Sequence, residues 1–264
     1  MNRKSRQPWA LALVVALAGA MLAIAPPQAR AADQQDVAAA VKAKLNKSQY
    51  KDVQVTADPN GVVTLSGTVP LYEFKEDADK IAHRVKGVSA VRNEIQAGGA
   101  EVSDAEIEKK LGPEIAYSRE GYGNLFDAIL LHVQNGVVTL SGQTHDYPDR
   151  DAAVALAATT PGVREVIDDI QVDPPSPMDD QIRMAVARSI YGFPSMNKYA
   201  INPVRPIRIV VDNGNVQLYG VVDSEADKNT AYIRAEAVPG VFSVKNYIQV
   251  AGQNNEGQGA GKEK

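Results

Sequence analysis

The residues that could perform chemistry are few, and their spacing does not predict a catalytic or metal-binding site. The three histidines, His83, His132 and His145, fall at unrelated positions and lack the spacing of a metal-binding motif. His132 alternates with apolar residues in a predicted strand, which points it toward solvent, and His83 lies on a predicted helix without a second ligand beside it. The chain has no cysteine, which excludes disulfides, thiolate nucleophiles and cysteine-based metal sites.

Three other kinds of pattern resemble functional motifs only in part. Ser66-Gly67 and Ser141-Gly142 end predicted strands, and no histidine is placed to activate either serine. Gly121-Tyr122-Gly123 lacks the third glycine and the preceding strand of a dinucleotide-binding loop. The pairs Asp168-Asp169 and Asp179-Asp180 are explained more simply as a strand edge and a helix cap than as catalytic carboxylates. We predict no catalytic residue, no metal ligand, no cofactor and no small-molecule substrate.

The clearest feature of the chain is a threefold internal repeat. Asn-Gly pairs and Gly-Val pairs recur at intervals of 75 and then 78 residues. These markers are Asn60-Gly61, Asn135-Gly136 and Asn213-Gly214, and then Gly87-Val88, Gly162-Val163 and Gly240-Val241. A fixed period of this length is typical of tandem structural modules.

Each copy predicts the order helix, strand, strand, helix, strand. The first helix has apolar residues every three or four positions, with N-caps expected at Asp36, at Ser103 or Asp104, and at Asp179 or Asp180. The two strands that flank the Asn-Gly pair alternate apolar and polar residues, and both residues of the pair tolerate the positive φ of a tight hairpin turn. The second helix is marked by paired alanines: Ala78 and Ala82, Ala153 and Ala157, Ala231 and Ala235. The glycine of each Gly-Val pair is expected to end this helix in a left-handed conformation.

A right-handed crossover through the second helix makes the second and third strands parallel. The predicted fold is therefore α+β, with three tandem α-β-β-α-β modules, each a three-stranded mixed sheet with two helices on one face. Gly98-Gly99-Ala100 predicts a flexible joint between the first two modules, and a proline-rich stretch predicts a stiffer joint after the second. The modules are expected over residues 33–98, 102–173 and 178–250, and a disordered tail over residues 251–264.

The N-terminus has the pattern of a secretory signal peptide over residues 1–31. Arg3, Lys4 and Arg6 precede an apolar run of about 16 residues, and Ala29-Arg30-Ala31 predicts cleavage after Ala31. The alternative, a retained membrane anchor, would need roughly 20 apolar residues. The absence of cysteine argues against a lipoprotein. Loss of the four basic leader residues would lower the net charge from −4 to −8, which disfavours nucleic acid as a partner and limits any membrane contact to a local surface.

The repeated pattern resembles the BON domain (bacterial osmotic-induction and nodulation) family over about residues 33–250. The matching residues are Asn60, Gly61, Leu65, Gly67, Gly87, Val88, Val91 and Asn93; Asn135, Gly136, Leu140, Gly142, Gly162, Val163, Val166 and Asp168; and Asn213, Gly214, Leu218, Gly220, Gly240, Val241, Val244 and Asn246. The resemblance implies the α-β-β-α-β fold, a periplasmic location, phospholipid or membrane association that protects the envelope under osmotic stress, and no enzymatic activity. Well-known periplasmic members have two copies, often behind a lipid anchor, whereas this chain has three and no anchoring cysteine.

The repeat is interrupted where copies two and three insert residues before the hairpin, at about 117–127 and 191–206. The second insert is aromatic and basic, and no acidic residue lies between Arg183 and Val211. Such a segment could sit at a lipid headgroup layer, or it could cover a sheet edge or pack against copy two. The residues predicted to bind a lipid or a partner are Tyr191, Phe193, Tyr199, Lys198, Arg205 and Arg208. Copy two has a smaller version with Tyr117, Arg119, Tyr122, Leu125 and Phe126.

Asn93, Asp168 and Asn246 recur at one position of the repeat. They could form a repeated ligand contact, but side chains that bond nearby backbone are the favoured explanation.

Two functional hypotheses follow from the sequence. The first is a non-enzymatic periplasmic protein that binds a phospholipid membrane surface and supports envelope integrity or osmotic-stress tolerance. The alternative is a multivalent scaffold that binds an envelope protein, peptidoglycan or unfolded periplasmic clients. The sequence does not determine the oligomeric state.

Overall fold

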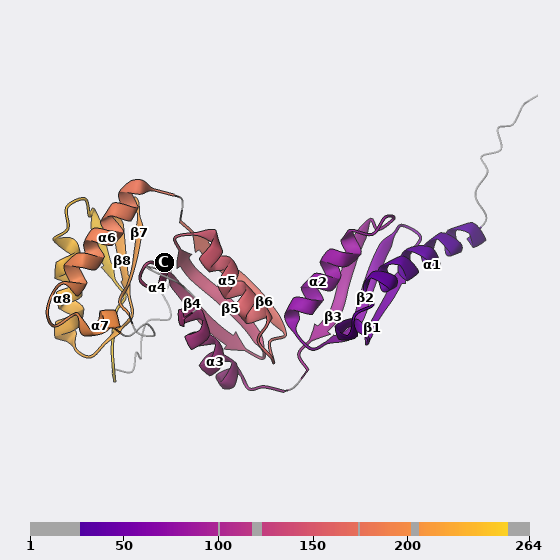
Figure 1. The fold of residues 1–264 in the computed structure, drawn as a ribbon, viewed down its shortest axis with the longest axis horizontal. Coiled ribbons are helices and arrows are strands. Elements are labelled where there is room, and N and C mark those ends of the chain that lie inside the picture. Colours follow the sequence, from indigo (N-terminus) through magenta and orange to yellow (C-terminus); the bar gives the residue numbers. More distant parts are fainter. Residues whose placement is uncertain (1–26, 100, 118–122, 174, 202–205, 253–264) are drawn as a thin grey trace, which may run out of the picture.

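The computed structural model describes residues 27–99, 101–117, 123–173, 175–201 and 206–252. The described chain forms three α/β units in a row, each built on its own three-stranded mixed sheet (Figure 1). This confirms the predicted α+β fold with three α-β-β-α-β modules. Residues 1–26 of the predicted signal peptide, Arg119, Tyr122, Arg205 and residues 253–264 of the predicted tail lie outside the described residues.

In the first module, β1 pairs antiparallel with β2, and β2 pairs parallel with β3. Both helices lie on the same face of this sheet and contact each other. The elements are α1 (Pro27–Lys44), η1 (Ser48–Tyr50), β1 (Val53–Ala57), β2 (Val62–Val69), α2 (Tyr72–His83) and β3 (Ala90–Ala97).

The second module repeats this topology, with strand order β4-β5-β6. Its insert contains one additional short helix, α4, directly before the first strand. The elements are α3 (Asp104–Tyr117), α4 (Gly123–Phe126), β4 (Ala128–Gln134), β5 (Val137–Thr144), α5 (Tyr147–Ala158) and β6 (Glu165–Val172).

The third module has strand order β7-β8-β10, and its second and third strands continue after a break as the parallel pair β9-β11. The break in the central strand falls at Gly220, which has a φ of 136°. The elements are α6 (Pro177–Tyr191), α7 (Lys198–Ile201), β7 (Arg208–Asp212), β8 (Asn215–Tyr219), β9 (Val221–Val222), α8 (Glu225–Glu236), β10 (Ser243–Asn246) and β11 (Gln249–Val250).

Each core forms between the inward face of a sheet and its two helices. The apolar residues of the strand that follows each hairpin turn are buried in all three modules, since Val63, Leu65, Val138, Leu140, Val216 and Leu218 have no exposed surface. Other alternating apolar residues, such as Val55 and Leu131, are partly buried against the same cores. The six alanines of the second helices are exposed by no more than 1%. Small side chains at these positions let α2, α5 and α8 pack closely on their sheets.

The hairpin turns confirm the prediction in two modules and correct it in one. Asn135 and Gly136 have φ values of 54° and 76°, and Asn213 and Gly214 have 48° and 75°. In the first module only Gly61 has a positive φ, so the prediction for Asn60 was wrong. Pro59 precedes Asn60 and fixes its own φ at a negative value, which favours a longer turn. The Asp58 carboxylate stabilises this turn by accepting hydrogen bonds from the backbone N–H groups of Asn60 and Val62.

The N-caps of the first helices were predicted correctly only in the second module. There, Ser103 and Glu106 form a capping box at the start of α3. Helix α1 begins at Pro27, which places Asp36 inside the helix. Helix α6 begins at Pro177 with Ser176 as its N-cap, so neither Asp179 nor Asp180 is the cap.

Asp104 and Asp179 have a different structural role. Asp104 accepts hydrogen bonds from the backbone N–H groups of Asn135 and Gly136 at 2.7 and 2.8 Å. Asp179 accepts from Asn213 and Gly214 at 3.1 and 2.9 Å. Each carboxylate therefore ties the first helix of its module to the hairpin turn.

The glycines of the Gly-Val pairs have the predicted left-handed conformation, with φ values of 97°, 90° and 92° at Gly87, Gly162 and Gly240. The position relative to the helix was predicted wrongly, because α2, α5 and α8 end four residues before these glycines. One further tight turn separates each helix from its glycine, which then directs the chain into the third strand.

The second and third modules share an interface. Helix α4 of the second module lies against β7 of the third. Leu125 and Phe126 pack against the core of the third module. Ile209 and Val211 occupy the inward face of β7, so Val210 points outward, and it nevertheless has no exposed surface. The first module contacts the second through α2 and α5, and Tyr72 packs against the cores of both.

Candidate functional site

The predicted lipid- or partner-binding residues of the third module do not form one exposed surface. Tyr199 is only 6% exposed, and its hydroxyl donates a 2.8 Å hydrogen bond to Asp227 while accepting one from the backbone N–H of Asp223. The Lys198 ammonium lies between the carboxylates of Asp223 and Asp227, at 2.8 and 3.1 Å. The positive charge of Lys198 is thus neutralised within the module.

The other predicted residues are dispersed. The Tyr191 hydroxyl donates a 2.6 Å hydrogen bond to the carbonyl of Ile207, and burial raises the pKa of Tyr191 above its usual range. Phe193 is 39% exposed and stacks under the guanidinium of Arg234, 5.5 Å from the ring centroid. Arg208 pairs with Tyr219 across the β7-β8 ladder, and Arg205 lies outside the described residues. A binding role for these residues stays a prediction.

The face of the third sheet opposite its helices carries a different aromatic group. The second module contacts part of this face, because Gln143 of β5 accepts a hydrogen bond from Gln217 of β8, and Gln217 accepts one from the Tyr219 hydroxyl at 2.7 Å. Tyr219 and Tyr247 stack with ring centroids 5.0 Å apart, on the face of β8 opposite the buried Val216 and Leu218. Val221 follows on the same face; Val221 is 38% exposed and Tyr247 is 47% exposed. We call Tyr219, Val221 and Tyr247 the aromatic face.

The repeat shows that the aromatic face is particular to the third module. At the positions 78 and 153 residues earlier, the other two modules have polar or charged residues in place of all three. These residues are Ser141 and Ser66 for Tyr219, Gln143 and Thr68 for Val221, and Asp169 and Glu94 for Tyr247. Exposed Lys245 adds a positive charge, and no acidic residue occurs from Ala237 to Val250.

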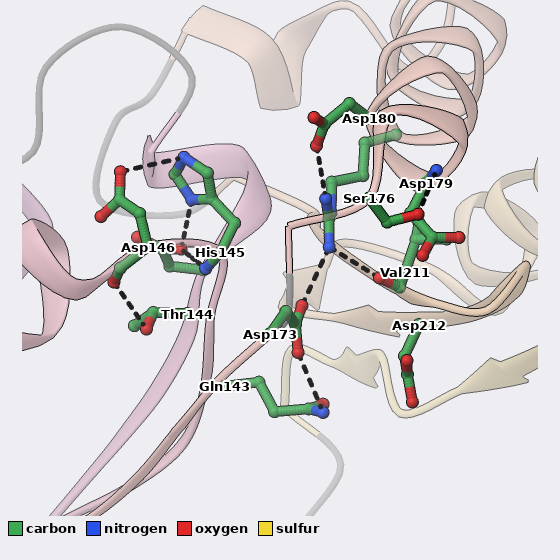
Figure 2. A network of polar contacts seen from close by, with 12 residues as sticks. Gln143, Thr144, His145, Asp146, Asp173, Ser176, Asp179, Asp180, Val211 and Asp212 are labelled. Atoms are coloured by element: carbon green, nitrogen blue, oxygen red, sulfur yellow. Dashed lines mark hydrogen bonds and ion pairs between the residues drawn. The ribbon is translucent and has the colours of Figure 1, made fainter.

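A buried polar network joins the second and third modules (Figure 2). Arg183 of α6 is 3% exposed and donates to Asp173, at the end of β6, at 3.0 Å. The same nitrogen donates to the carbonyl of Val211 at 2.7 Å, and the other terminal nitrogen pairs with Asp180. Gln143 of β5 bridges from Asp173 to Gln217 of β8. Burial raises the pKa of Asp173 despite the attraction of Arg183.

Beside this network, the second module gathers Asp127, His145 and Asp149, with one ligand atom from each lying within 4.8 Å of the others. Asp127 is completely buried, and its Oδ1 accepts a hydrogen bond from the backbone N–H of His145 and lies 2.8 Å from His145 Nδ1. The contact with Asp127 raises the pKa of His145. Burial, together with the neighbouring Asp127 carboxylate, raises the pKa of Asp149 to about 7.

The third residue of the second helix and its contact partner differ in chemical type between the three modules. Asp149 is the third residue of the second helix, and the repeat aligns it with Asp227 in the third module and Phe74 in the first. The partner always comes from the segment before the first strand. It is Tyr50, packed edge to face on Phe74, in the first module; Asp127 in the second; and Lys198 with Tyr199 in the third.

The recurring position at Asn93, Asp168 and Asn246 serves the backbone, as predicted. The amides of Asn93 and Asn246 donate to the carbonyls of Lys75 and Lys228 at 2.8 and 3.1 Å. Each of the three side chains also accepts from the N–H two residues later. Asp168 cannot donate, and instead binds the side chain of Arg150, the residue equivalent to Lys75 and Lys228.

The family model for the BON domain matches residues 33–99, 103–174 and 195–252. The chain belongs to the BON domain family. The third matched segment begins after α6, although α6 packs as the first helix of that module.

Among curated proteins, the chain is similar to the osmotically-inducible protein Y of Escherichia coli (strain K12). The two are 29% identical over 154 residues, which cover 53% of this chain and 72% of that protein.

Solved structures resemble the BON chain only distantly. The C-terminal domain of CdsD, a structural protein of the type III secretion system of Chlamydia trachomatis, is 16% identical with a TM-score of 0.24, covering 82% of this chain and 98% of that one. The periplasmic domain of the type III secretion inner membrane protein PrgH from S. typhimurium is 10% identical with a TM-score of 0.20, covering 79% and 98%. Within the described residues, no helix combines the length and apolar composition of a membrane span.

Sequence reasoning missed both the aromatic face and the Asp127-His145-Asp149 cluster. The aromatic face could have been found by comparing the outward positions of the three copies, since only the third copy is aromatic there. The cluster leaves a weaker trace, because Asp127 lies in an insert that has no fixed register with the repeat.

Proposed function

We propose that this BON-domain chain is a non-enzymatic periplasmic protein that binds phospholipid membrane through its third module and supports envelope integrity under osmotic stress. The observation that carries the proposal is the aromatic face, which replaces polar residues of the other two modules with two tyrosines and a valine. The relative named for osmotic induction supports the link to osmotic stress. The signal-peptide pattern over residues 1–31 supports export.

Tyrosine suits the boundary between headgroups and acyl chains, because its ring is apolar while its hydroxyl is polar. Exposed Lys245, which lies opposite Gln217 on the same side of the sheet, supplies positive charge near the rings for lipid phosphates. The net charge of the whole chain is −4, so general electrostatic attraction to an anionic bilayer is weak. Binding therefore depends on this local surface.

Co-sedimentation with vesicles of phosphatidylethanolamine and phosphatidylglycerol tests the proposal. The pair Tyr219→Ser and Tyr247→Asp gives the third module the residues that the second module has at these positions, so the fold should be retained. We expect this double variant to lose most of its vesicle binding. The matched control is Ile233→Ser, which removes a 60% exposed apolar residue of α8, on the helical side of the module, and should leave binding unchanged.

Placing the two tyrosines in the first module tests whether the stacked pair is sufficient for vesicle binding. Ser66→Tyr with Glu94→Tyr builds the stacked pair into the first module and should increase vesicle binding. If the unmodified chain does not sediment with vesicles and instead captures a stoichiometric protein from envelope extract, the membrane proposal fails and the scaffold hypothesis takes its place.

A further inference from the structure

We propose that Asp127, His145 and Asp149 of the second module form a binding site for a divalent first-row metal ion such as Zn²⁺. The site is separate from the aromatic face and does not depend on membrane binding. One nitrogen and two carboxylate oxygens form a ligand set that suits Zn²⁺ or Mn²⁺ better than a soft ion such as Cu⁺.

Three elements bring the ligands together. Asp127 directly precedes β4, His145 directly follows the antiparallel partner β5, and Asp149 lies in the first turn of α5. His145 Nδ1 is 2.8 Å from Asp127 Oδ1 and 3.9 Å from Asp149 Oδ2. Ligand atoms bound to one zinc ion at about 2.1 Å lie roughly 3 to 4 Å apart. Small side-chain rotations therefore suffice to place an ion between the three atoms.

The imidazole is oriented as a metal ligand requires. The Asp146 carboxylate lies 3.5 Å from Nε2, on the edge of the ring that faces away from the other two ligands. Metal-binding histidines commonly present their second ring nitrogen to a carboxylate, which fixes the ring and the tautomer. Asp146 is itself fixed as the N-cap of α5, because its Oδ1 accepts a hydrogen bond from the backbone N–H of Asp149.

The third module shows that this place in the fold accepts a cation. There the Lys198 ammonium lies 3.1 Å from Asp227, the equivalent of Asp149, and 2.8 Å from Asp223, the equivalent of His145. The second module adds a buried carboxylate, Asp127, and replaces Asp223 with a histidine. The position that binds an ammonium in one module thus has metal-ligand chemistry in the other.

Charge and access agree with this assignment. Two carboxylates meet at the cluster, and the pKa of Asp149 is raised first by its burial and then by the neighbouring Asp127 carboxylate, so a second negative charge there is costly. A divalent cation would remove that cost. The side chains of His145 and Asp149 are 27% and 18% exposed, so an ion can enter and water can complete its coordination.

The small number of histidines makes a direct test possible. In a chain purified without a histidine tag, the imidazole resonances of His83, His132 and His145 can be followed by NMR during titration with Zn²⁺. We expect saturable shifts of the His145 ring at Zn²⁺ concentrations that leave His132, the internal control, unshifted. His83 should respond only at higher concentration, because the structure corrects the expectation that it has no second ligand: Asp79 lies 3.5 Å from its Nε2, but no third ligand joins them among the described residues. Mn²⁺ should broaden the same His145 resonances first.

Asp149→Asn preserves the shape of the side chain while removing a ligand charge, and it should weaken Zn²⁺ binding by at least about 10-fold. Without metal, its melting temperature should be equal to or higher than that of the unmodified chain, because the carboxylate crowding is gone. A purely structural cluster would lose stability in this variant with no change in metal response. The matched control His132→Ala should bind Zn²⁺ normally. The proposal is overturned if His145 does not shift at millimolar Zn²⁺, if all three histidines shift in parallel, or if Asp149→Asn leaves the Zn²⁺ affinity unchanged.

Discussion

At the scale of single residues, the three modules show how different side chains behave at equivalent positions of the same fold. The position of Asn93 is asparagine again at Asn246 and aspartate at Asp168, and the residue it binds changes accordingly. An amide can donate to the carbonyl of the second helix, whereas a carboxylate cannot and takes an arginine side chain instead. The partner of a residue therefore follows from its donor capacity.

This difference between Asn93 and Asp168 predicts that a second substitution can restore the stability lost by Asn93→Asp. Asn93→Asp in the first module removes the donor to the Lys75 carbonyl and should lower the free energy of unfolding by about 1 to 2 kcal/mol. Adding Lys75→Arg recreates the Arg150-Asp168 pair of the second module and should recover at least half of the loss. Urea unfolding of the four chains in a double-mutant cycle measures the coupling. Additive effects would contradict the equivalence of the two positions.

Asp179 gives a second prediction at this scale. Burial alone would raise the pKa of Asp179, but hydrogen bonds from Gly214, Ser176 and Asn213 outweigh it and hold the pKa below its usual range. A lowered folded-state pKa means that the stabilisation is present above the unfolded value of about 3.9 and is lost as the pH falls through the folded value. Asp179→Ala should therefore cost about 1 to 3 kcal/mol at pH 7 and progressively less in acid.

Thermal unfolding of Asp179→Ala at neutral and acidic pH measures this difference, with exposed Asp169→Ala as the control for lost negative charge. A loss of stability that is equally large at both pH values would show that the carboxylate charge is not what fastens the hairpin turn.

At the scale of elements, the sequence predicted regular structure well and junctions less well. Strand alternation and paired alanines determine which face is buried, and those predictions were confirmed at Val63, Leu65 and the six alanines. The predicted N-cap was wrong where the side chain binds a segment that is distant in the sequence. Asp179 resembles a cap in the sequence, but its carboxylate binds amides 34 and 35 residues away, so local spacing could not reveal its role. The repeat contains no information on how the copies pack. Contact between copies was therefore predicted only as one alternative for the insert of copy three, whereas Leu125 and Phe126 of the copy-two insert pack against the third module.

The hairpin turns predict different responses to one substitution. Asn213 has a φ of 48°, and non-glycine residues other than asparagine and aspartate adopt this region at a cost of roughly 1 to 2 kcal/mol. Asn213→Ala should therefore destabilise the third module by about 1 kcal/mol. Asn60→Ala should have a smaller effect, because Asn60 does not have a positive φ. Thermal melting of both variants distinguishes them, and equal losses would contradict the assigned turn types.

At the scale of the whole molecule, the modules are coupled unequally. The first is joined to the second through Gly98 and Gly99 and through the contact of α2 with α5. The second and third share apolar contacts at Leu125 and Phe126 and a buried ion pair. The second and third modules should therefore unfold together while the first unfolds separately, which places the aromatic face and the proposed metal site on one cooperative unit.

The ion pair between Arg183 and Asp173 tests this coupling. Arg183→Met leaves the buried Asp173 carboxylate without its cation, and removal of one partner from a buried pair costs about 3 to 5 kcal/mol. Hydrogen–deuterium exchange should then accelerate across β7, where Val210 is covered by the second module, and remain unchanged in β1 of the first. Adding Asp173→Leu removes the uncompensated charge and should restore much of the protection, since apolar side chains often replace a buried ion pair with little loss. Exchange in β7 that is unaffected by Arg183→Met would mean that the two modules are held together by the packing of α4 alone.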